Sequence, residues 1–490
     1  MSSRKKFYIT TPIYYTNDVP HIGHSYTTII ADILARYHRL LGEDVFFLTG
    51  TDEHGIKIQR IAEKKNKKPK QFVDEIVNEF KKAWKTLNIE YDNFIRTTDE
   101  KHIKIVQDIL QKLYDKKMIY KGKYEAYYCT GCEQYKTSSE LVNGTCPLHN
   151  TTVEVRSEEA YLFKLSKFQK ELRKLIENNE YKILPIQRKN EMLSFLIRED
   201  LQDISISRPK SEVYWGIELP FDKNHTCYVW IDAFLNYISG LNYPSEQFRK
   251  YWPADIQLMS KDILRVHSTI WPSILLSINE KLPKMLYIHG YFTVNGQKMS
   301  KSLGNAIDPI KLSEKYGSDA VRYFLMRHIP LGEDGDFSED ALKERYNSEL
   351  ANKLGNLVLR VAGMAKGKIP KSSIDADLAS NLKLTEIYSH MDNVALDKAL
   401  EKIFGFIDKC NEYIQEKQPW KLEGKEKEKV LYNLIDSIRI ISILLYPFMP
   451  ETSKKINKQF NFPKPSIENA VFGKTKEGKI KKLGVLFEKL

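Results

Sequence analysis

The first sixty residues combine two short apolar runs with one amphipathic segment between them. Residues 7–11 are β-branched and aromatic and predict a strand, while residues 23–41 place isoleucine, leucine and tyrosine at the spacing of one helix face. Gly42 is a natural helix end, and residues 44–49 form an apolar run typical of a buried strand. This order predicts a βαβ unit and a parallel sheet, whose ligands bind beyond the carboxyl ends of the strands.

The pattern changes twice further along the chain. From about residue 119 to 225 it consists of short segments rich in tyrosine, glycine and cysteine, which indicates an insertion with small folds of its own. Strand-like runs at 226–231 and 285–289 then predict that the first sheet resumes. Beyond about residue 342 the periodicity is almost wholly helical and favours a helical bundle.

Composition and charge indicate the class of partner. The 490 residues include 76 Lys and Arg against 64 Asp and Glu, and the net charge of +12 favours nucleic acid or an anionic membrane as partner. A membrane role is disfavoured because the longest apolar stretch, residues 440–449, is much shorter than the roughly 20 residues of a spanning helix. Five cysteines are too few for a disulfide framework, and no apolar signal core precedes residue 7. We expect a soluble cytosolic protein of about three domains.

The turn after the first predicted strand carries a candidate anion site. It lacks both common glycine-rich nucleotide motifs and instead has His21 and His24 at the start of the helix, where backbone N–H groups and the helix dipole attract anions. The two histidines share a helix face, and Gly23 between them lets a ligand approach the backbone. Taken alone, this tetrapeptide is better explained as an ordinary helix start.

A second candidate phosphate site lies near residue 300. Lys298 and Lys301 are three residues apart in a glycine-flanked loop, which suits them to hold a polyphosphate as point charges. An exposed basic loop would explain this segment by itself. The two motifs together, one on each half of an interrupted α/β fold, are far more specific than either.

These segments resemble the His-Ile-Gly-His and Lys-Met-Ser-Lys-Ser signatures of class I aminoacyl-tRNA synthetases, and the resemblance extends from residue 7 to about 420. Residues 11–15, 50–55, 228–233 and 336–338 resemble the methionyl-tRNA synthetases in particular. The resemblance implies a ligase that activates methionine with ATP to methionyl-adenylate, releasing pyrophosphate. It then transfers the methionyl group to the 3′-terminal ribose of tRNA(Met).

The resemblance implies catalytic roles for the histidine and lysine pairs, with Mg²⁺ bridging the phosphates of ATP. The methionine carboxylate is already ionised near neutrality, so the first step needs positioning and charge stabilisation and no general base. The implied ATP site consists of His21, Gly23, His24, Asp262, Gly290, Lys298, Ser300 and Lys301.

The resemblance also implies a methionine pocket with an aromatic lining, in which sulfur–ring contacts are favourable. Asp52 would accept the substrate ammonium group, although its local sequence fits a helix cap equally well. The chain departs from some family members at Phe234 and Val266. The implied pocket consists of Ile13, Tyr15, Asp52, Trp230, Ala233, Tyr237, Ile263, His267 and Trp271.

Two pairs of soft ligands predict a metal site within the insertion. Cys129 and Cys132 are followed, after 13 residues, by Cys146 and His149 in a second knuckle. This spacing is typical of a closed tetrahedral zinc site with a structural role. A redox-active cysteine pair would leave the second knuckle unexplained. The expected fold class is therefore α/β: a Rossmann-type parallel sheet interrupted by a zinc-binding insertion, followed by an α-helical bundle.

The resemblance divides the chain into five predicted regions. They are the first half of the Rossmann catalytic domain (1–117), the connective insertion with the zinc knuckle (118–227), the second half of the catalytic domain (228–291), the lysine loop with the stem-contact region (292–352), and the α-helical anticodon-binding domain (353–490).

In the last region the resemblance implies anticodon contacts from Asn356, Arg360 and Trp420, through hydrogen bonds to an unstacked base and an aromatic platform. Without it, a helix surface pair and a packed tryptophan would explain these residues. The chain ends without the appended tRNA-binding module through which some members dimerise, so we expect a monomer.

Three other functions compete with the methionine ligase. A nucleotidyltransferase of the same fold would leave the helical third of the chain without a role, and a zinc-containing RNA-binding protein would leave both phosphate signatures without one. A cysteinyl enzyme would need a metal-ligand cysteine where residues 10–13 stand.

Overall fold

The computed structural model describes residues 4–131, 134–136, 141–147, 151–294, 296–299, 304–481 and 484–490. At residues 124–126, 134–136, 156–158 and 298 it describes the backbone alone.

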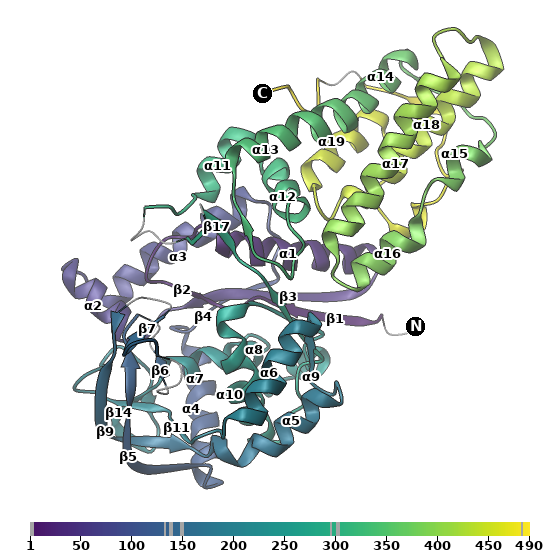
Figure 1. Cartoon of the computed structure of the whole chain (residues 1–490). Coiled ribbons are helices and arrows are strands. Elements are labelled where there is room, and N and C mark those ends of the chain that lie inside the picture. Colours follow the sequence, from purple (N-terminus) through teal and green to yellow (C-terminus); the bar gives the residue numbers. More distant parts are fainter. Residues whose placement is uncertain are drawn as a thin grey trace.

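A seven-stranded sheet occupies the centre of the molecule (Figure 1), and its strands pair in parallel. The order is β10-β16-β15-β1-β3-β2, and β4 pairs with β3 as well. The strands are β1 (Lys6–Thr10), β2 (Tyr14–Tyr15), β3 (Asp44–Asp52), β4 (Asn93–Arg96), β10 (Lys182–Leu184), β15 (Ile256–Ser260) and β16 (Met285–His289). With α1 (Ile22–Leu40) between β1 and β3, the predicted βαβ unit is confirmed.

Each face of the sheet is covered by helices, so the central strands are buried on both sides. Phe7 and Ile9 of β1 belong to the core that includes α1, whereas Tyr8 between them belongs to the opposite core. The opposite core includes α4 (Glu100–Asp115) and α10 (Leu264–Ser277). Successive side chains of a strand point to opposite faces, and helices on both faces explain the nearly continuous apolar runs of β1 and β3.

The strand predicted over 226–231 is wrong. Strand β14 (Asp222–Cys227) ends there in a small antiparallel sheet with β12 (Ser207–Pro209) and β13 (Glu218–Leu219). Helix α7 (Val229–Phe234) follows at once. The predicted strand ends with the apolar residues 229–231 that begin α7, and periodicity cannot distinguish so short an apolar run from the start of a buried helix.

The central sheet also contains one strand from the segment predicted as an insertion. Strand β10 lies within residues 118–227 and pairs with β16 at the edge of the sheet. The rest of that segment contains a second sheet, β11-β9-β5-β6, dominated by the long antiparallel pair β5 (Ile119–Cys129) and β9 (Glu154–Phe163). Its other elements are β6 (Gln134–Lys136), β7 (Thr145–Cys146), β8 (Thr151–Thr152), α5 (Gln169–Glu177), α6 (Ile186–Arg198) and β11 (Ile204–Ser205).

The C-terminal third is helical, as predicted, and extends away from the sheet as an arm (Figure 1). Helices α11 (Pro309–Tyr316), α12 (Ser318–Arg327) and α13 (Glu339–Arg345) connect the sheet to the arm. Helical backbone then continues through Tyr346–Gly355 into α14. The arm contains α14 (Asn356–Met364), α15 (Ala376–Ser380), α16 (Leu384–Asp392), α17 (Leu396–Lys417), α18 (Gly424–Leu445) and α19 (Pro450–Phe460).

A fully buried arginine joins the arm to the part of the molecule that contains the central sheet. Arg322 of α12 donates hydrogen bonds to the carbonyl oxygens of Pro447 and Phe448 in the arm. Its guanidinium also pairs with Asp32 of α1 at 2.7 Å, and Arg36 holds the same carboxylate. Burial alone would raise the pKa of Asp32, but Arg322 and Arg36 hold this pKa below its ordinary value. Because an unpaired charge here would be costly, the three side chains fix α1, α12 and the arm relative to one another.

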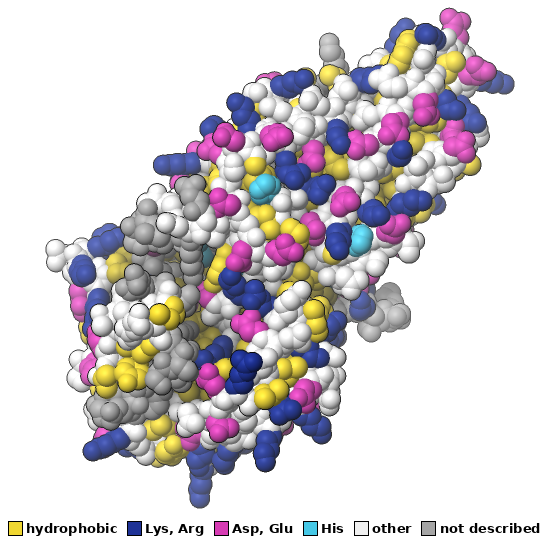
Figure 2. All heavy atoms as spheres, in the orientation of Figure 1, with side chains coloured by type: hydrophobic (Ala, Val, Ile, Leu, Met, Phe, Trp, Pro, Cys, Tyr) yellow, Lys and Arg dark blue, Asp and Glu magenta, His cyan; other side chains and the backbone are white. Residues whose placement is uncertain are grey.

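The surface carries charges of both signs. On the face shown in Figure 2, Lys and Arg side chains are interspersed with Asp and Glu over the helical arm. No helix in the described part of the chain is long and apolar enough to cross a membrane.

We predict that Gly50→Ala destabilises the sheet. An alanine Cβ at this position of β3 would lie 2.0 Å from the carbonyl oxygen of Ile95, its partner in β4, so the two strands would have to separate. We expect the free energy of unfolding in urea to fall by about 1–3 kcal/mol. The matched control is Gly405→Ala in α17, where a Cβ meets nothing within 4 Å. It should raise stability by about 0.5–1 kcal/mol, and equal effects of the two variants would contradict the prediction.

Candidate active site

The imidazole rings of the two histidines at the start of α1 accept hydrogen bonds from backbone N–H groups at the start of the helix. The Nδ1 atom of His21 accepts a hydrogen bond from the Gly23 N–H at 3.0 Å, and the Nδ1 atom of His24 accepts from the His21 N–H at 3.1 Å. The ring centroids are 3.9 Å apart. A neutral imidazole that accepts at Nδ1 carries its proton on Nε2, so each ring presents an N–H donor on its outer side. The helix N-terminus thereby gains two further donors suited to an anion.

The chain around the lysine signature lies beside this helix start. The Ile22 N–H donates to the carbonyl oxygen of Ile307 at 3.0 Å. Met299 and both histidines line one cavity of about 370 Å³. The structure therefore brings Met299, the described side chain of the lysine signature, to the same cavity as the two histidines, although the segments are far apart in the sequence. The Lys298 side chain, Ser300 and Lys301 lie outside the described residues.

The same cavity contains the other predicted ATP residues. Asp262 follows β15 and accepts a hydrogen bond from the Ser260 hydroxyl. Gly290 follows β16, where an added Cβ would lie 2.0 Å from the carbonyl oxygen of Glu333, so only glycine fits. The cavity is lined by Pro12, Ile13, Tyr14, Tyr15, Asn17, His21, Gly23, His24, Tyr26, Thr27, Lys57, Gly131, Trp230, Ser260, Asp262, Ile263, His289, Gly290, Tyr291, Phe292 and Met299.

His289 is a lining residue that the sequence analysis did not identify. Its Nδ1–H donates to the Gly290 carbonyl oxygen at 2.7 Å, and its Nε2 accepts from the Thr27 hydroxyl at 2.7 Å. Burial lowers the pKa of this imidazole, so the ring is neutral at physiological pH. Its apolar strand gives no local sign of the role, because the ring finds its partners only in the folded chain.

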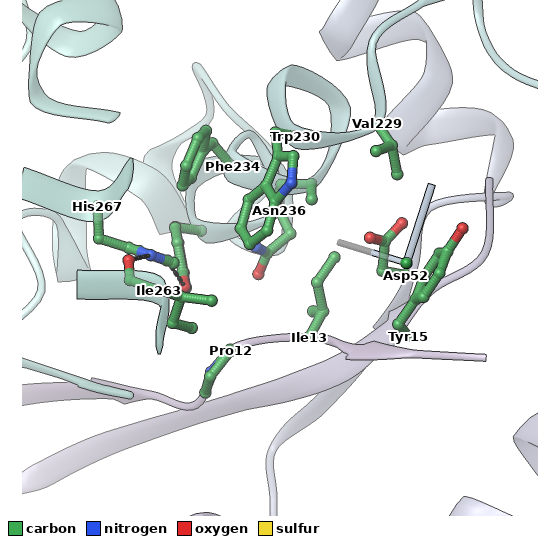
Figure 3. Close-up of a pocket in the computed structure, with 13 residues that line it drawn as sticks. Pro12, Ile13, Tyr15, Asp52, Val229, Trp230, Phe234, Asn236, Ile263 and His267 are labelled. Atoms are coloured by element: carbon green, nitrogen blue, oxygen red, sulfur yellow. Dashed lines mark hydrogen bonds between the residues drawn. The ribbon is translucent and has the colours of Figure 1, made fainter. Parts of the chain in front are cut away.

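A second cavity of about 230 Å³ adjoins the first and shares several of its lining residues. All the residues predicted to bind methionine line it except Trp271. Figure 3 shows Asp52 and Tyr15 at one end, His267 and Phe234 at the other, and Trp230 across from Ile13. The remaining lining residues are Pro12, Gly131, Val229, Ala233, Asn236, Tyr237 and Ile263. The cavity therefore has a carboxylate at one end and an aromatic, mostly apolar lining elsewhere.

Trp271 lies behind the lining. Its ring is fully buried, stacks on Phe234 with centroids 6.1 Å apart, and donates from Nε1 to Gln257 at 3.1 Å. Phe234 lines the cavity instead. Sequence could identify both aromatic residues but not which one stands in front.

His267 closes the apolar end as a neutral ring. Its Nδ1–H donates to the Ile263 carbonyl oxygen at 2.9 Å, and its Nε2 accepts from the Tyr237 hydroxyl at 2.8 Å. Burial lowers the pKa of His267 to about 4. The ring is therefore uncharged at neutral pH and compatible with an apolar ligand group.

The structure excludes one of the two interpretations of Asp52, that of a helix cap. Helix α2 (Ile56–Lys64) is capped at Gly55, so Asp52 is not its cap and instead lines the second cavity at the end of β3. The loop that carries Asp52 is anchored by Glu53, a buried carboxylate held by two hydrogen bonds of 2.7 Å from Arg96. Such a bidentate pair restricts the orientation of the loop.

The predicted metal ligands are described only in part. Cys129 at the end of β5 and Cys146 in β7 are both buried, whereas Cys132 and His149 lie outside the described residues. Within the described part of the chain, no group of three or more His, Cys, Asp or Glu side chains is arranged to hold a metal. Gly131, in the first knuckle, lines both cavities, so this part of the insertion borders the site.

The predicted anticodon residues lie on the arm. Asn356 and Arg360 are on α14, and the Arg360 guanidinium carbon is 5.9 Å from the centroid of the Trp420 ring. Trp420 is half exposed, with 50% of its surface accessible. An exposed aromatic ring beside an arginine can stack on and hydrogen-bond an unpaired base.

The sequence matches two known families along most of its length. Residues 7–153 and 136–362 match the class I tRNA synthetases of the methionyl type, "tRNA synthetases class I (M)". Residues 380–487 match the "Anticodon-binding domain of tRNA ligase". The first match covers the sheet-containing part of the molecule and extends into α14, and the second covers most of the remaining helical arm.

Individual relatives agree with these family matches. A methionine–tRNA ligase of Caldanaerobacter subterraneus is 48% identical, over 99% of this chain and 79% of its own length. The Thermotoga maritima ligase is 45% identical, over 95% and 77%.

Solved structures extend the agreement to three dimensions. Mycobacterium tuberculosis methionyl-tRNA synthetase in complex with methionyl-adenylate is 36% identical, with a TM-score of 0.94 and 99% of both chains covered. The free form of that enzyme gives a TM-score of 0.86 at 34% identity. Sequence, fold and site geometry together show that the chain belongs to the methionyl-tRNA synthetase family of class I aminoacyl-tRNA synthetases.

Proposed function

We propose that the two adjoining cavities are the ATP and methionine sites of the ligase. The activity is that of the family: the chain is an ATP-dependent ligase that joins methionine to tRNA. The observation that carries the site proposal is the shared border of the cavities. Ile13, Tyr15, Trp230 and Ile263 line both, so a carboxylate bound near this border would face a phosphate held by His21 and His24.

Methionine fits the second cavity in one orientation. Asp52 would accept the ammonium group, and the thioether would lie among Trp230, Phe234 and His267, where each sulfur–ring contact contributes about 0.3–1.5 kcal/mol. The neutral His267 adds no charge that would disfavour an apolar chain. The substrate carboxylate would then point toward the first cavity.

Activation joins a carboxylate oxygen of methionine to the α-phosphorus of ATP and releases pyrophosphate. The Nε2–H groups of His21 and His24 would donate to phosphate oxygens whose charge increases in the transition state, and Lys298 and Lys301 would hold the leaving pyrophosphate. Mg²⁺ bound to the phosphate oxygens would neutralise part of their charge. The similarity to an adenylate-bound relative supports this arrangement of the site.

Transfer requires the tRNA to reach the same cleft while its anticodon contacts the arm. A terminal ribose hydroxyl attacks the adenylate carbonyl carbon, AMP leaves, and the ester of methionine and tRNA is released. We assign the anticodon contacts to Asn356, Arg360 and Trp420, because α14 and the exposed ring form a platform for an unstacked base.

We further propose one structural zinc ion held by Cys129, Cys132, Cys146 and His149. The burial of Cys129 and Cys146 at strand ends supports this assignment, as does the softness of the donor set. The ion would stiffen the knuckle that contributes Gly131 to both cavities. We also propose that the enzyme acts as a monomer in the cytoplasm, where its tRNA substrate is charged.

His24→Asn tests the activation site. The asparagine carboxamide oxygen can replace Nδ1 as the acceptor for the His21 N–H, so the helix cap is kept, but the Nε2–H donor is lost. We expect methionine-dependent ATP–pyrophosphate exchange to fall about 10²–10³-fold with an unchanged melting temperature. Exchange in the unaltered enzyme should occur with methionine and with none of the other nineteen amino acids. Normal exchange by the variant would remove His24 from catalysis.

Trp420→Ala tests the anticodon platform. Loss of one base–aromatic stack should weaken tRNA binding by about 1–3 kcal/mol and raise the KM for tRNA(Met), while methionine-dependent exchange is unchanged. Ile374→Ala, which removes another exposed apolar side chain from the same third of the chain, should leave both measurements unchanged. A parallel loss of exchange and charging in Trp420→Ala would contradict a role limited to tRNA.

Metal analysis tests the zinc site. The purified chain should contain about one zinc per molecule, and Cys146→Ser should lose it because the closed site would have only three strong ligands. Cys410→Ser is the control: this thiol is equally buried but lies in α17 of the arm, so zinc content should not change. Zinc-free but fully active wild-type enzyme would overturn the assignment.

A further inference from the structure

A buried carboxylate lies behind the methionine cavity and binds two imidazoles at once. The Oδ2 atom of Asp232 is 2.7 Å from His54 Nδ1, and its Oδ1 atom is 2.6 Å from His102 Nε2. All three side chains are at least 94% buried. Among the residues that line the two cavities, none of these three occurs. The array therefore acts on the site only through its neighbours.

The array connects two elements that contribute to the lining of the cavity. His54 lies two residues beyond Asp52 in the loop after β3, while Asp232 lies on α7 between Trp230 and Ala233. The carboxylate thus ties the loop of the ammonium acceptor to the helix of the aromatic wall. Two segments that the sequence analysis singled out, 50–55 and 228–233, meet at this bond.

The third member extends the connection to a further helix. His102 belongs to α4, and its Nδ1 is 2.7 Å from the hydroxyl of Ser239 in α8 (Asn236–Ser239). Helix α8 also carries Tyr237, which lines the cavity and donates to His267. One chain of hydrogen bonds therefore connects the loop after β3 with α7, α4 and α8.

The directions of these hydrogen bonds are determined by charge. Burial alone would raise the pKa of Asp232, but His54 and His102 hold it below its ordinary value, so the carboxylate is ionised and accepts on both oxygens. His54 must then donate from Nδ1 and His102 from Nε2, while the other nitrogen of His102, Nδ1, lies 2.7 Å from the Ser239 hydroxyl. A buried donor or acceptor left without its partner is costly, so each bond resists displacement of the elements it joins.

We propose that Asp232, with His54 and His102, is a positioning residue that sets the separation of Asp52 from the aromatic wall and thereby the affinity for methionine. This inference rests on the proposed assignment of the second cavity to methionine. An apolar cluster could fill the same volume, but it would not hold the loop and α7 at a fixed distance through directional bonds. The ATP half of the site is built separately, by the cap at the start of α1.

The two rings use different nitrogens, and this difference provides the experiment. A glutamine carboxamide reaches the position of Nε2, whereas an asparagine carboxamide reaches that of Nδ1. At His54, Asn should therefore preserve the bond to Asp232 and Gln should lose it; at His102, Gln should preserve it and Asn should lose it. If the two histidines only filled space, the same substitute, for example the larger glutamine, would preserve the KM for methionine better at both positions.

We expect His54→Gln and His102→Asn to raise the KM for methionine at least about tenfold in pyrophosphate exchange. His54→Asn and His102→Gln should stay within about threefold of wild type, and the KM for ATP should change little in all four. Asp232→Asn cannot accept hydrogen bonds from both rings, so it should also raise the KM for methionine at least about tenfold. Asp436→Asn is the control, since it removes a buried carboxylate bonded to Arg439 and Thr475 in the arm. It should lower the melting temperature and leave the KM for methionine unchanged.

The outcomes separate this inference from the proposed function. Wild-type exchange that does not depend on methionine would overturn both. If wild-type exchange depends on methionine but the same substitute is preferred at both histidines, or if the KM for ATP rises in parallel, only the positioning role is overturned.

Discussion

The site depends on the parallel register of the central sheet, which places the carboxyl ends of its strands at one edge. The segment after β1 leads to His21 and His24, β3 ends at Asp52, β15 is followed by Asp262, and β16 is followed by Gly290. Residues that are far apart in the sequence therefore line two adjoining cavities. Any change that shifts one strand against its neighbour would displace the residues that line the cavities as well as those of the core.

Histidine chemistry at this edge is controlled by local partners. His21 and His24 accept at Nδ1 and so donate from Nε2, whereas His267 and His289 donate from Nδ1 and accept at Nε2. The first arrangement provides N–H donors for an anion, and the second makes neutral walls that supply no charge. One residue type thus provides both N–H donors and neutral walls, because backbone and hydroxyl partners select the tautomer in each place.

The helical arm is joined to this edge through α1. Its start carries the histidine pair, and its middle carries Asp32, which binds the same Arg322 that holds the carbonyl oxygens of residues 447 and 448. A connection of this kind fixes the position of the arm, which carries the exposed Trp420 ring, relative to the cleft.

The sequence by itself determined the βαβ unit, the helical C-terminal third and the residue types at the site, because hydrophobic periodicity and short motifs are local properties. Through its resemblance to a known family, the sequence also pointed to Asp52, Trp230 and His267, which the fold brings to one cavity. Tertiary structure decided what depends on neighbours far along the chain. The apolar run of α7 became a helix because the surrounding core buries it, and Phe234 rather than Trp271 faces the cavity because of how α7 and α10 pack. The two imidazole partners of Asp232 come from distant segments of the chain, so these hydrogen bonds form only in the folded protein. The sequence shows that a side chain can donate or accept a hydrogen bond, but the fold decides which partner it meets.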